Sequence, residues 1–156
     1  MKKSLFGLLL LSACQTNASE CNPGETMIAS CTLSEKTQNI AAFCTNEKAD
    51  TLYYFFRENE NTQLKVEFSA SRKLKRWVDK WTYTTYFGFS QGKYDYILIV
   101  PEEKPNAVAF LNIKKDGVSI SMKKCNSNSF GEKDIQSNKI EEVLDAAVRD
   151  NGFKFP

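Results

Sequence analysis

Apolar and polar residues alternate along most of the chain between residues 27 and 124, and this two-residue period is typical of β-strands. In Gln63–Ser69, for example, Leu64, Val66 and Phe68 point one way while the residues between them are polar or charged. The pattern predicts strands at Met27–Thr32, Asn39–Cys44, Thr51–Arg57, Gln63–Ser69, Trp81–Phe89, Tyr94–Val100, Ala107–Ile113 and Val118–Lys123.

Turn residues separate these segments. Asp116-Gly117, between the last two segments, is the strongest hairpin signal in the chain. Pro101 and Pro105 mark a loop, because proline cannot donate to a strand ladder. About eight short strands at this spacing predict an antiparallel meander that closes into a barrel or packs as a sandwich.

The hydrophobic period becomes helical near the end of the chain. The apolar residues there recur at intervals of three and four, as one stripe of a helix does: Ile140, Val143, Leu144, Ala147 and Val148. Asn138 and Glu141 suit the start of a helix, and Gly152 suits its end. We therefore predict one C-terminal helix packed on the sheet, and an α+β fold that is mainly antiparallel β.

The N-terminus has the form of an export signal. Met1-Lys2-Lys3 is cationic, and a short apolar run follows that is well below the ~20 residues of a membrane span. Leu11-Ser12-Ala13-Cys14 resembles the lipobox of bacterial lipoproteins. The resemblance implies cleavage before Cys14 and lipidation of Cys14, and the non-acidic Gln15 implies the outer membrane, facing the periplasm. Cleavage after Ala18, which would give a soluble periplasmic protein, stays open as the alternative.

These boundaries divide the chain into a signal (1–13), a lipidated N-terminus and tether (14–26) and a single β-rich domain with its C-terminal helix (27–156). Because Lys2 and Lys3 leave with the signal, the 21 Lys and Arg residues of the whole chain fall to 19, against 19 Asp and Glu. A mature protein without net positive charge offers no global field for nucleic acid, so we expect no nucleic-acid partner.

The cysteine count agrees with export. The chain has five cysteines, and assigning Cys14 to lipid leaves an even set suited to two disulfides: Cys21, Cys31, Cys44 and Cys125. Three pairings are open. We favour Cys31–Cys44 with Cys21–Cys125, because the second bond would join the start of the domain to its far end. With no CxxC and no histidine, the sequence predicts no metal site.

Candidate catalytic groups are scarce. The absence of histidine removes the commonest general base and the Ser-His and Cys-His nucleophile pairs. Ser121 and Lys124 match SxxK but lie on a predicted strand, on opposite faces, and Glu102-Glu103 and Glu141-Glu142 are best explained as solvated charge. We predict a protein that is not an enzyme, with no catalytic residues and no cofactor.

The unusual segment is Ser71–Lys80, which is basic, contains a tryptophan and is longer than a hairpin requires. Arginine and tryptophan are enriched at the energetic centres of protein interfaces. We predict a partner-binding loop made by Arg72, Lys73, Lys75, Arg76, Trp77 and Lys80. The alternatives are a lid in which Leu74, Trp77 and Val78 cover the end of the barrel, or a secondary contact with anionic lipid headgroups.

The aromatic residues of the strands give a second candidate, a ligand slot lined by rings, with Tyr86 beside Gly88 at an exposed edge. Most of these rings are expected to form the core.

In format, a small β-domain with a lipobox and paired cysteines is similar to periplasmic lysozyme-inhibitor lipoproteins and to periplasmic immunity proteins against cell-wall-degrading toxins. The resemblance implies that a loop on a rigid scaffold blocks the cleft of a peptidoglycan hydrolase or toxin. The alternatives are a structural or assembly lipoprotein that binds another envelope protein, and a barrel that binds a small ligand.

Overall fold

The computed structural model of the chain describes residues 20–33, 39–126 and 129–156. The predicted export signal, Cys14 and the first part of the predicted tether lie outside the described residues. No helix within the described residues has the length and apolar character that a membrane span requires.

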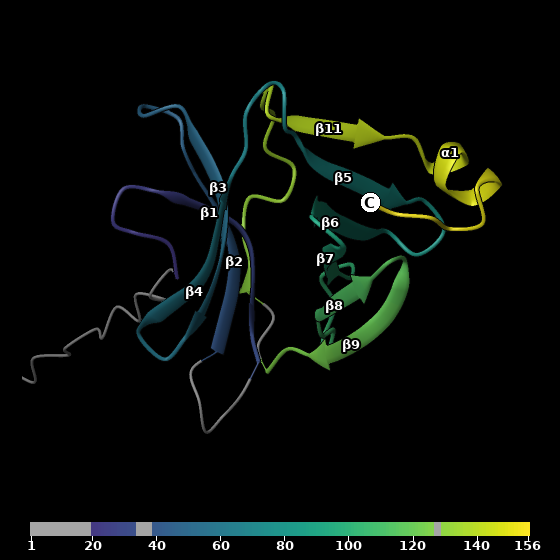
Figure 1. Cartoon of the computed structure of the whole chain (residues 1–156), viewed down its shortest axis with the longest axis horizontal. Coiled ribbons are helices and arrows are strands. Elements are labelled where there is room, and N and C mark those ends of the chain that lie inside the picture. Colours follow the sequence, from purple (N-terminus) through teal and green to yellow (C-terminus); the bar gives the residue numbers. More distant parts are fainter. Residues whose placement is uncertain (1–19, 34–38, 127–128) are drawn as a thin grey trace, which may run out of the picture.

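The described residues form two sheets and one short helix, shown in Figure 1. The first sheet has five strands in the order β10-β1-β2-β3-β4, and the second has six in the order β11-β5-β6-β7-β8-β9. The first sheet comprises β1 (Thr26–Thr32), β2 (Asn39–Asn46), β3 (Thr51–Glu58), β4 (Asn61–Glu67) and β10 (Ser129–Phe130). The second comprises β5 (Leu74–Asp79), β6 (Thr84–Gln91), β7 (Tyr94–Val100), β8 (Phe110–Lys115), β9 (Val118–Lys124) and β11 (Ile140–Val143), and α1 (Asp145–Asp150) follows it.

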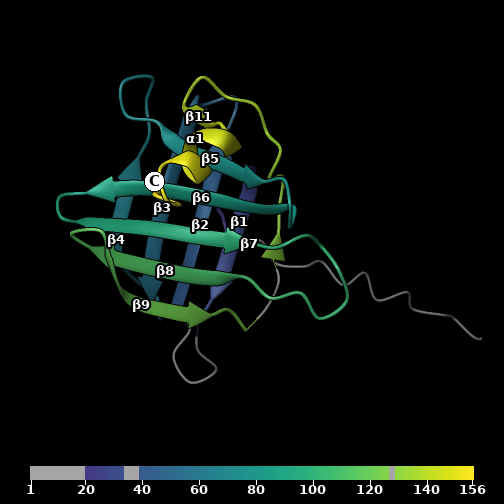
Figure 2. The same ribbon diagram turned by 90° about the vertical axis from the view of Figure 1, so that its right-hand side faces the viewer.

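The two sheets pack face to face as a sandwich, and their strands cross steeply in Figure 2. All neighbouring strands pair antiparallel except β11 and β5, which are parallel. The sheets do not close into a barrel. The mainly antiparallel β fold with a C-terminal helix is therefore confirmed, in its sandwich form.

Aromatic residues fill the space between the sheets. Tyr54 from the five-stranded sheet and Phe89 from the six-stranded sheet have ring centroids 4.9 Å apart, and Phe43 and Phe87 meet in the same way at 5.7 Å. All four side chains are buried. Rings of this size supply most of the apolar burial that holds two sheets together.

The disulfides are Cys21–Cys44 and Cys31–Cys125, so both bonds of the favoured pairing, Cys31–Cys44 and Cys21–Cys125, are wrong. The register of β1 and β2 explains the difference. Cys44 lies opposite Met27 and Cys31 lies opposite Ala41, so Cys31 and Cys44 are at opposite ends of this strand pair. The bond at Cys21 also fixes the chain to β2 before residue 27, within the segment predicted to be a tether.

The segment predicted to be one C-terminal helix begins as a strand and ends as a short helix. Residues 140–143 form β11, which pairs with β5 in the register Ile140 to Leu74 and Val143 to Trp77. Only residues 145–150 are helical, and Leu144, placed on the buried stripe by the sequence pattern, is exposed. The free edge of β5 offers backbone hydrogen bonds that a helical period in the sequence does not reveal.

Candidate binding site on the outer face of the six-stranded sheet

The predicted partner-binding loop is largely a strand. Residues 74–79 form β5, which lies between β6 and β11 inside the sheet. Arg76 and Trp77 are buried, whereas Arg72, Lys73 and Lys80 are exposed. Each face of this strand combines charged and apolar residues, with Lys75, Trp77 and Asp79 on one face and Leu74, Arg76 and Val78 on the other, so no alternation of polar and apolar residues marks it in the sequence.

Arg76 is a structural residue. Its guanidinium donates to Glu142 of β11 at 2.8 Å and to the backbone carbonyls of Lys133 and Ile135 at 2.7 and 2.8 Å. Its side chain is 4% exposed. A buried guanidinium with these partners holds β11 and the segment before it against β5, and it is not available to a partner.

Trp77 and Arg76 point to opposite faces of β5. We call the face that carries Trp77 the outer face, because it points away from the five-stranded sheet. Its ring stacks on Tyr86 at a centroid distance of 4.3 Å, and its indole N–H donates to Asp145 at 3.0 Å. Burial, together with the negative charge of Asp79, raises the pKa of Tyr86. Because its hydrogen bond reaches Asp145, the first residue of α1, Trp77 anchors the start of this helix to the sheet.

Next to Trp77 lies a groove of about 270 Å³, which we call the outer groove. Its floor comes from the sheet, with Ile97 and Ile99 of β7 and Met122 of β9, and its wall includes Phe153 and Phe155 from the C-terminal segment. Asn112 and Lys114 are its polar lining. The groove is mainly apolar and opens to solvent beside the free end of the chain.

The C-terminal segment that forms this wall is held by a specific contact. Phe155 packs on Gly88 so closely that a Cβ at position 88 would lie 2.6 Å from the Cε1 atom of Phe155. Lys114 donates from its ammonium to the carbonyl of Phe155 at 2.6 Å. The missing side chain at Gly88 thus provides the space into which the Phe155 ring packs. Tyr86 is only partly buried beside it, as one lining residue of the outer groove.

Phe153, which lines one end of the outer groove, shares Arg149 with a second exposed ring, Trp81, and we call Trp81 and Phe153 the aromatic rim. Trp81 and Phe153 lie on the guanidinium of Arg149, at 5.0 and 5.4 Å. Trp81 is 81% exposed and Phe153 57% exposed. Trp81 and Tyr83, predicted to belong to a strand, lie in the turn before β6, where Tyr83 has a φ of 54°.

Arg149 is itself fixed by two carboxylates. It forms ion pairs with Asp79 and with Asp145, the latter at 3.1 Å. Burial opposes ionisation of Asp145, but hydrogen bonds from Trp77 and Arg149 and the charge of Arg149 hold the pKa of Asp145 below its usual value. This network orients Arg149, and Arg149 in turn supports the two rings of the rim.

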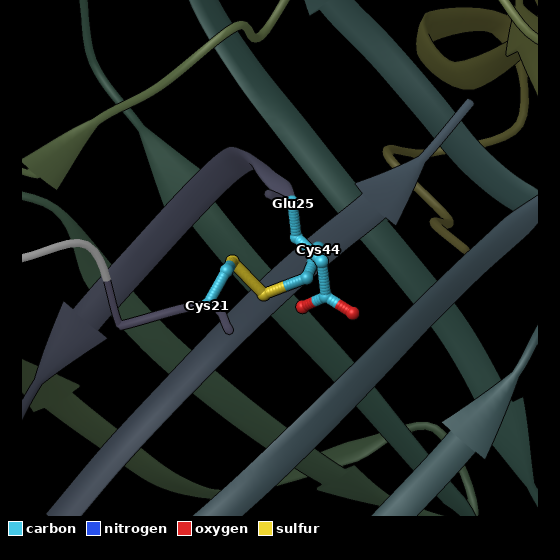
Figure 3. A group of neighbouring side chains, drawn as sticks. All are labelled: Cys21, Glu25 and Cys44. Carbon is cyan, nitrogen blue, oxygen red and sulfur yellow. A yellow bond between two sulfur atoms is a disulfide. The ribbon is translucent and has the colours of Figure 1, made fainter. Parts of the chain in front are cut away.

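A second group, on the outer face of the five-stranded sheet, brings together Cys21, Glu25 and Cys44 (Figure 3). The two sulfur atoms are bonded to each other, so neither is available as a thiolate ligand. Glu25 accepts a hydrogen bond from the Tyr53 hydroxyl at 2.5 Å. Burial raises the pKa of Glu25, but hydrogen bonds from Tyr53 and Asn22 outweigh it and lower the pKa overall. This group fits a structural role.

Comparison of the chain with family models, with curated proteins and with solved structures finds no match in any of the three. The fold and contacts define the class of molecule: a β-sandwich with two disulfides, which is typical of proteins that work in an oxidising compartment.

Proposed function

We propose that this chain is a non-catalytic protein of the bacterial cell envelope that binds a protein partner through the outer groove and the aromatic rim. The partner that we propose is a cell-wall-degrading enzyme or delivered toxin, whose activity the bound protein inhibits. The lipobox at Leu11–Cys14 supports attachment to the outer membrane, facing the periplasm.

The observation that carries the proposal is the exposure of Trp81 next to an apolar groove. Tryptophan, tyrosine and arginine dominate the energetics of protein interfaces, and they do so where they are held in place before binding. Arg149 is clamped by Asp79 and Asp145 and lies against the Trp81 ring. The rim therefore presents a pre-organised aromatic surface.

The size of the outer groove favours a protein over a small ligand. Sites for drug-sized ligands usually enclose about 300–1,000 Å³ and cover most of the ligand. The groove measures about 270 Å³ and is open on one side. It suits one large apolar side chain inserted by a partner, with the rim covering the surface around it.

The mechanism that follows is occlusion. The disulfide between Cys31 and Cys125 links β1 to the chain just after β9, and Arg76 joins β11 to β5, so the face that carries the rim has little freedom to deform. A rigid surface that covers the cleft of a hydrolase blocks access of its polymeric substrate. This step requires no chemistry from the inhibitor.

A two-stage experiment tests the proposal. The protein, purified with its disulfides formed, is immobilised and exposed to envelope and secreted fractions, and bound proteins are identified by mass spectrometry. Each captured hydrolase is then assayed by the clearing of a peptidoglycan suspension. We expect near-stoichiometric inhibition, weakened at least ~30-fold by joint Trp81→Ala and Phe153→Ala substitution, as expected when an interface hot spot is lost.

Tyr94→Ala is the matched control, because Tyr94 is an exposed ring on β7 of the same sheet that lines neither groove nor rim. The control is expected to inhibit as the parent protein does. Capture of a partner without inhibition would instead identify an assembly or structural role. Turnover of peptidoglycan by the purified protein itself would overturn the non-catalytic assignment.

A further inference from the structure

The polar lining of the outer groove comes from two residues of β8, Asn112 and Lys114. Asn112 lies in register between Ile97 of β7 and Met122 of β9, and both of these neighbours also line the groove. None of the described residues that line the groove is acidic. The hydrogen-bonding capacity of Asn112 and Lys114 therefore decides which polar atoms a bound group must present.

Asn112 is held in one orientation. Its side-chain carbonyl accepts a hydrogen bond from the Ser119 hydroxyl at 2.7 Å, and the residue is only 6% exposed. The oxygen and the nitrogen of a carboxamide point in different directions, and the nitrogen can only donate. With the oxygen engaged by Ser119, the N–H groups of Asn112 are the ones left for a bound group.

Lys114 is a donor as well, and it carries a charge. Its ammonium has three N–H groups, of which one binds the carbonyl of Phe155 at 2.6 Å. Asp95 lies opposite Lys114 in the register of β7 and β8, but it accepts a hydrogen bond from Ser90 at 2.6 Å. Within the described residues Lys114 forms no ion pair, so its charge is available to an anionic group.

The C-terminal segment is an internal example of what this surface binds. Phe155 packs its ring on Gly88 and presents its carbonyl to Lys114. Trp77 and Tyr86 lie against the same ring, at centroid distances of 5.9 and 6.2 Å. One residue thus places an apolar ring on the sheet and a hydrogen-bond acceptor on the lysine.

We propose that the outer groove selects a partner segment in which a large apolar side chain adjoins a carboxylate, and that Lys114 is the residue that binds the carboxylate. The assignment rests on the proposed function, because it names the chemistry of the partner at the same groove. The apolar side chain lies over Ile97 and Ile99, and the carboxylate accepts from Lys114 and Asn112. A cationic group in this position would face two donors without an acceptor, which is disfavoured.

Three small probes that share a benzene ring test this preference without any hydrolase: the anion phenylacetate, its neutral amide phenylacetamide, and the cation benzylamine. Each is titrated into the disulfide-bonded, isotopically labelled protein and followed by nuclear magnetic resonance. We expect phenylacetate to bind about fivefold more tightly than phenylacetamide, the gain of one hydrogen bond to a charged group at a partly exposed site. Benzylamine is expected not to bind. The backbone signals that shift are expected to include those of Ile97, Asn112 and Lys114.

Substitution then assigns the preference to one side chain. Lys114→Met is expected to reduce the affinity for phenylacetate to that for phenylacetamide, and Lys114→Arg, which retains the charge, is expected to keep the difference. Lys124→Met is the matched control, because Lys124 lies opposite Phe110 on the same strand pair and does not line the groove. That control is expected to keep the full preference.

The comparison of the three probes on the unsubstituted protein does not depend on any variant folding. Equal binding of the acid and the amide, binding of benzylamine as tight as that of phenylacetate, no binding of any probe up to its solubility limit, or shifts confined to another surface would overturn the assignment. Failure of the probes leaves the proposed function to be judged by its own inhibition assay, and failure of that assay leaves a charge preference at the groove intact.

Discussion

The outer faces of the two sheets differ in how their large hydrophobic side chains are exposed to solvent. On the five-stranded sheet, Tyr53 and Phe55 are each 6% exposed, and their rings are covered by Lys65 at 4.6 Å and Arg57 at 5.0 Å. On the six-stranded sheet and the segments attached to it lie all the large hydrophobic residues that are exposed in the described chain: Trp81, Tyr83, Tyr94, Phe110, Val118, Ile120, Met122, Leu144 and Phe153.

The difference shows that the two sheets of this small disulfide-bonded domain have different roles. Isolated exposed hydrophobic residues are ordinary, but their confinement to one half of a molecule is not. The five-stranded half contains three of the four bonded cysteines and is covered by cations. It serves as a closed scaffold, and the six-stranded half carries the outer groove and the aromatic rim that we propose for the partner.

The largest expected loss of stability comes from removing the disulfide that links the two halves. Replacing Cys31 and Cys125 with alanine opens a bridge between residues 94 positions apart. The loop-entropy model predicts a loss of about 4–5 kcal/mol in the free energy of unfolding, measured in urea. Replacing Cys21 and Cys44, which are 23 positions apart, is expected to cost only about 3 kcal/mol. A reversed order would show that the N-terminal bridge dominates.

The next effect concerns the noncovalent attachment of β11. Arg76→Met removes the guanidinium that binds Glu142 and the carbonyls of Lys133 and Ile135. We expect a loss of about 3 kcal/mol, because the substitution removes a buried donor and leaves two backbone carbonyls unsatisfied, whereas Glu142, 52% exposed, is free to turn toward solvent. Faster hydrogen exchange is expected in residues 140–143. Lys75→Met on the same strand is the control, and an equal loss there would contradict a specific role for Arg76.

A smaller effect is expected at the wall of the outer groove. Gly88→Ala places a methyl group where Phe155 packs, so the C-terminal segment must shift, at a cost of about 1–3 kcal/mol. In the background of Phe155→Ala the same substitution is expected to have a smaller effect, since the contacts with the Phe155 ring are gone and only the contact with Pro156, at 3.0 Å, remains. Chemical unfolding of the single and double variants measures this coupling, and additive losses would rule it out.

The smallest effect sharpens the description of the five-stranded half. The hydrogen bonds from Tyr53 and Asn22 lower the pKa of Glu25 below its usual 4.5, so the ionised carboxylate stabilises the folded protein. This contribution is complete above pH 4.5 and is lost as the pH falls through the pKa of the folded state. Glu25→Gln is expected to flatten the acid limb of the stability curve, measured by chemical unfolding as the pH is lowered, and an unchanged acid limb would contradict this role.

Local signals in the sequence predicted most of the sandwich. The alternation in Gln63–Ser69 and the Asp116-Gly117 turn are confirmed, because burial of one face and the φ requirements of a tight turn act within a few residues. Strand β5 was not predicted because its charged residues favoured an exposed loop. Arg76 is buried there because its guanidinium binds groups that lie 57 to 66 positions away in the sequence. No local pattern contains those partners.

The same limit applies to the candidate site. Trp77 was predicted to be exposed, but it is buried against Tyr86 and Asp145, whereas Trp81 was assigned to a strand and is the exposed ring of the rim. The outer groove depends on Phe155 reaching Gly88, a contact between distant positions. A sequence shows which side chains are suited to an interface, but tertiary packing decides which of them face solvent.

The last 30 residues contribute to both sheets, since β10 pairs with β1 and β11 pairs with β5 (Figure 1). A chain made from its N-terminus therefore lacks an outermost strand on each layer until β10 (Ser129–Phe130) and β11 (Ile140–Val143) have been made. Neither layer has its full set of neighbours before then, and Cys125 is also among the late residues. This order of assembly delays stable folding until residues 125–143 are available, so the two sheets and the bond between them are completed together at a late stage.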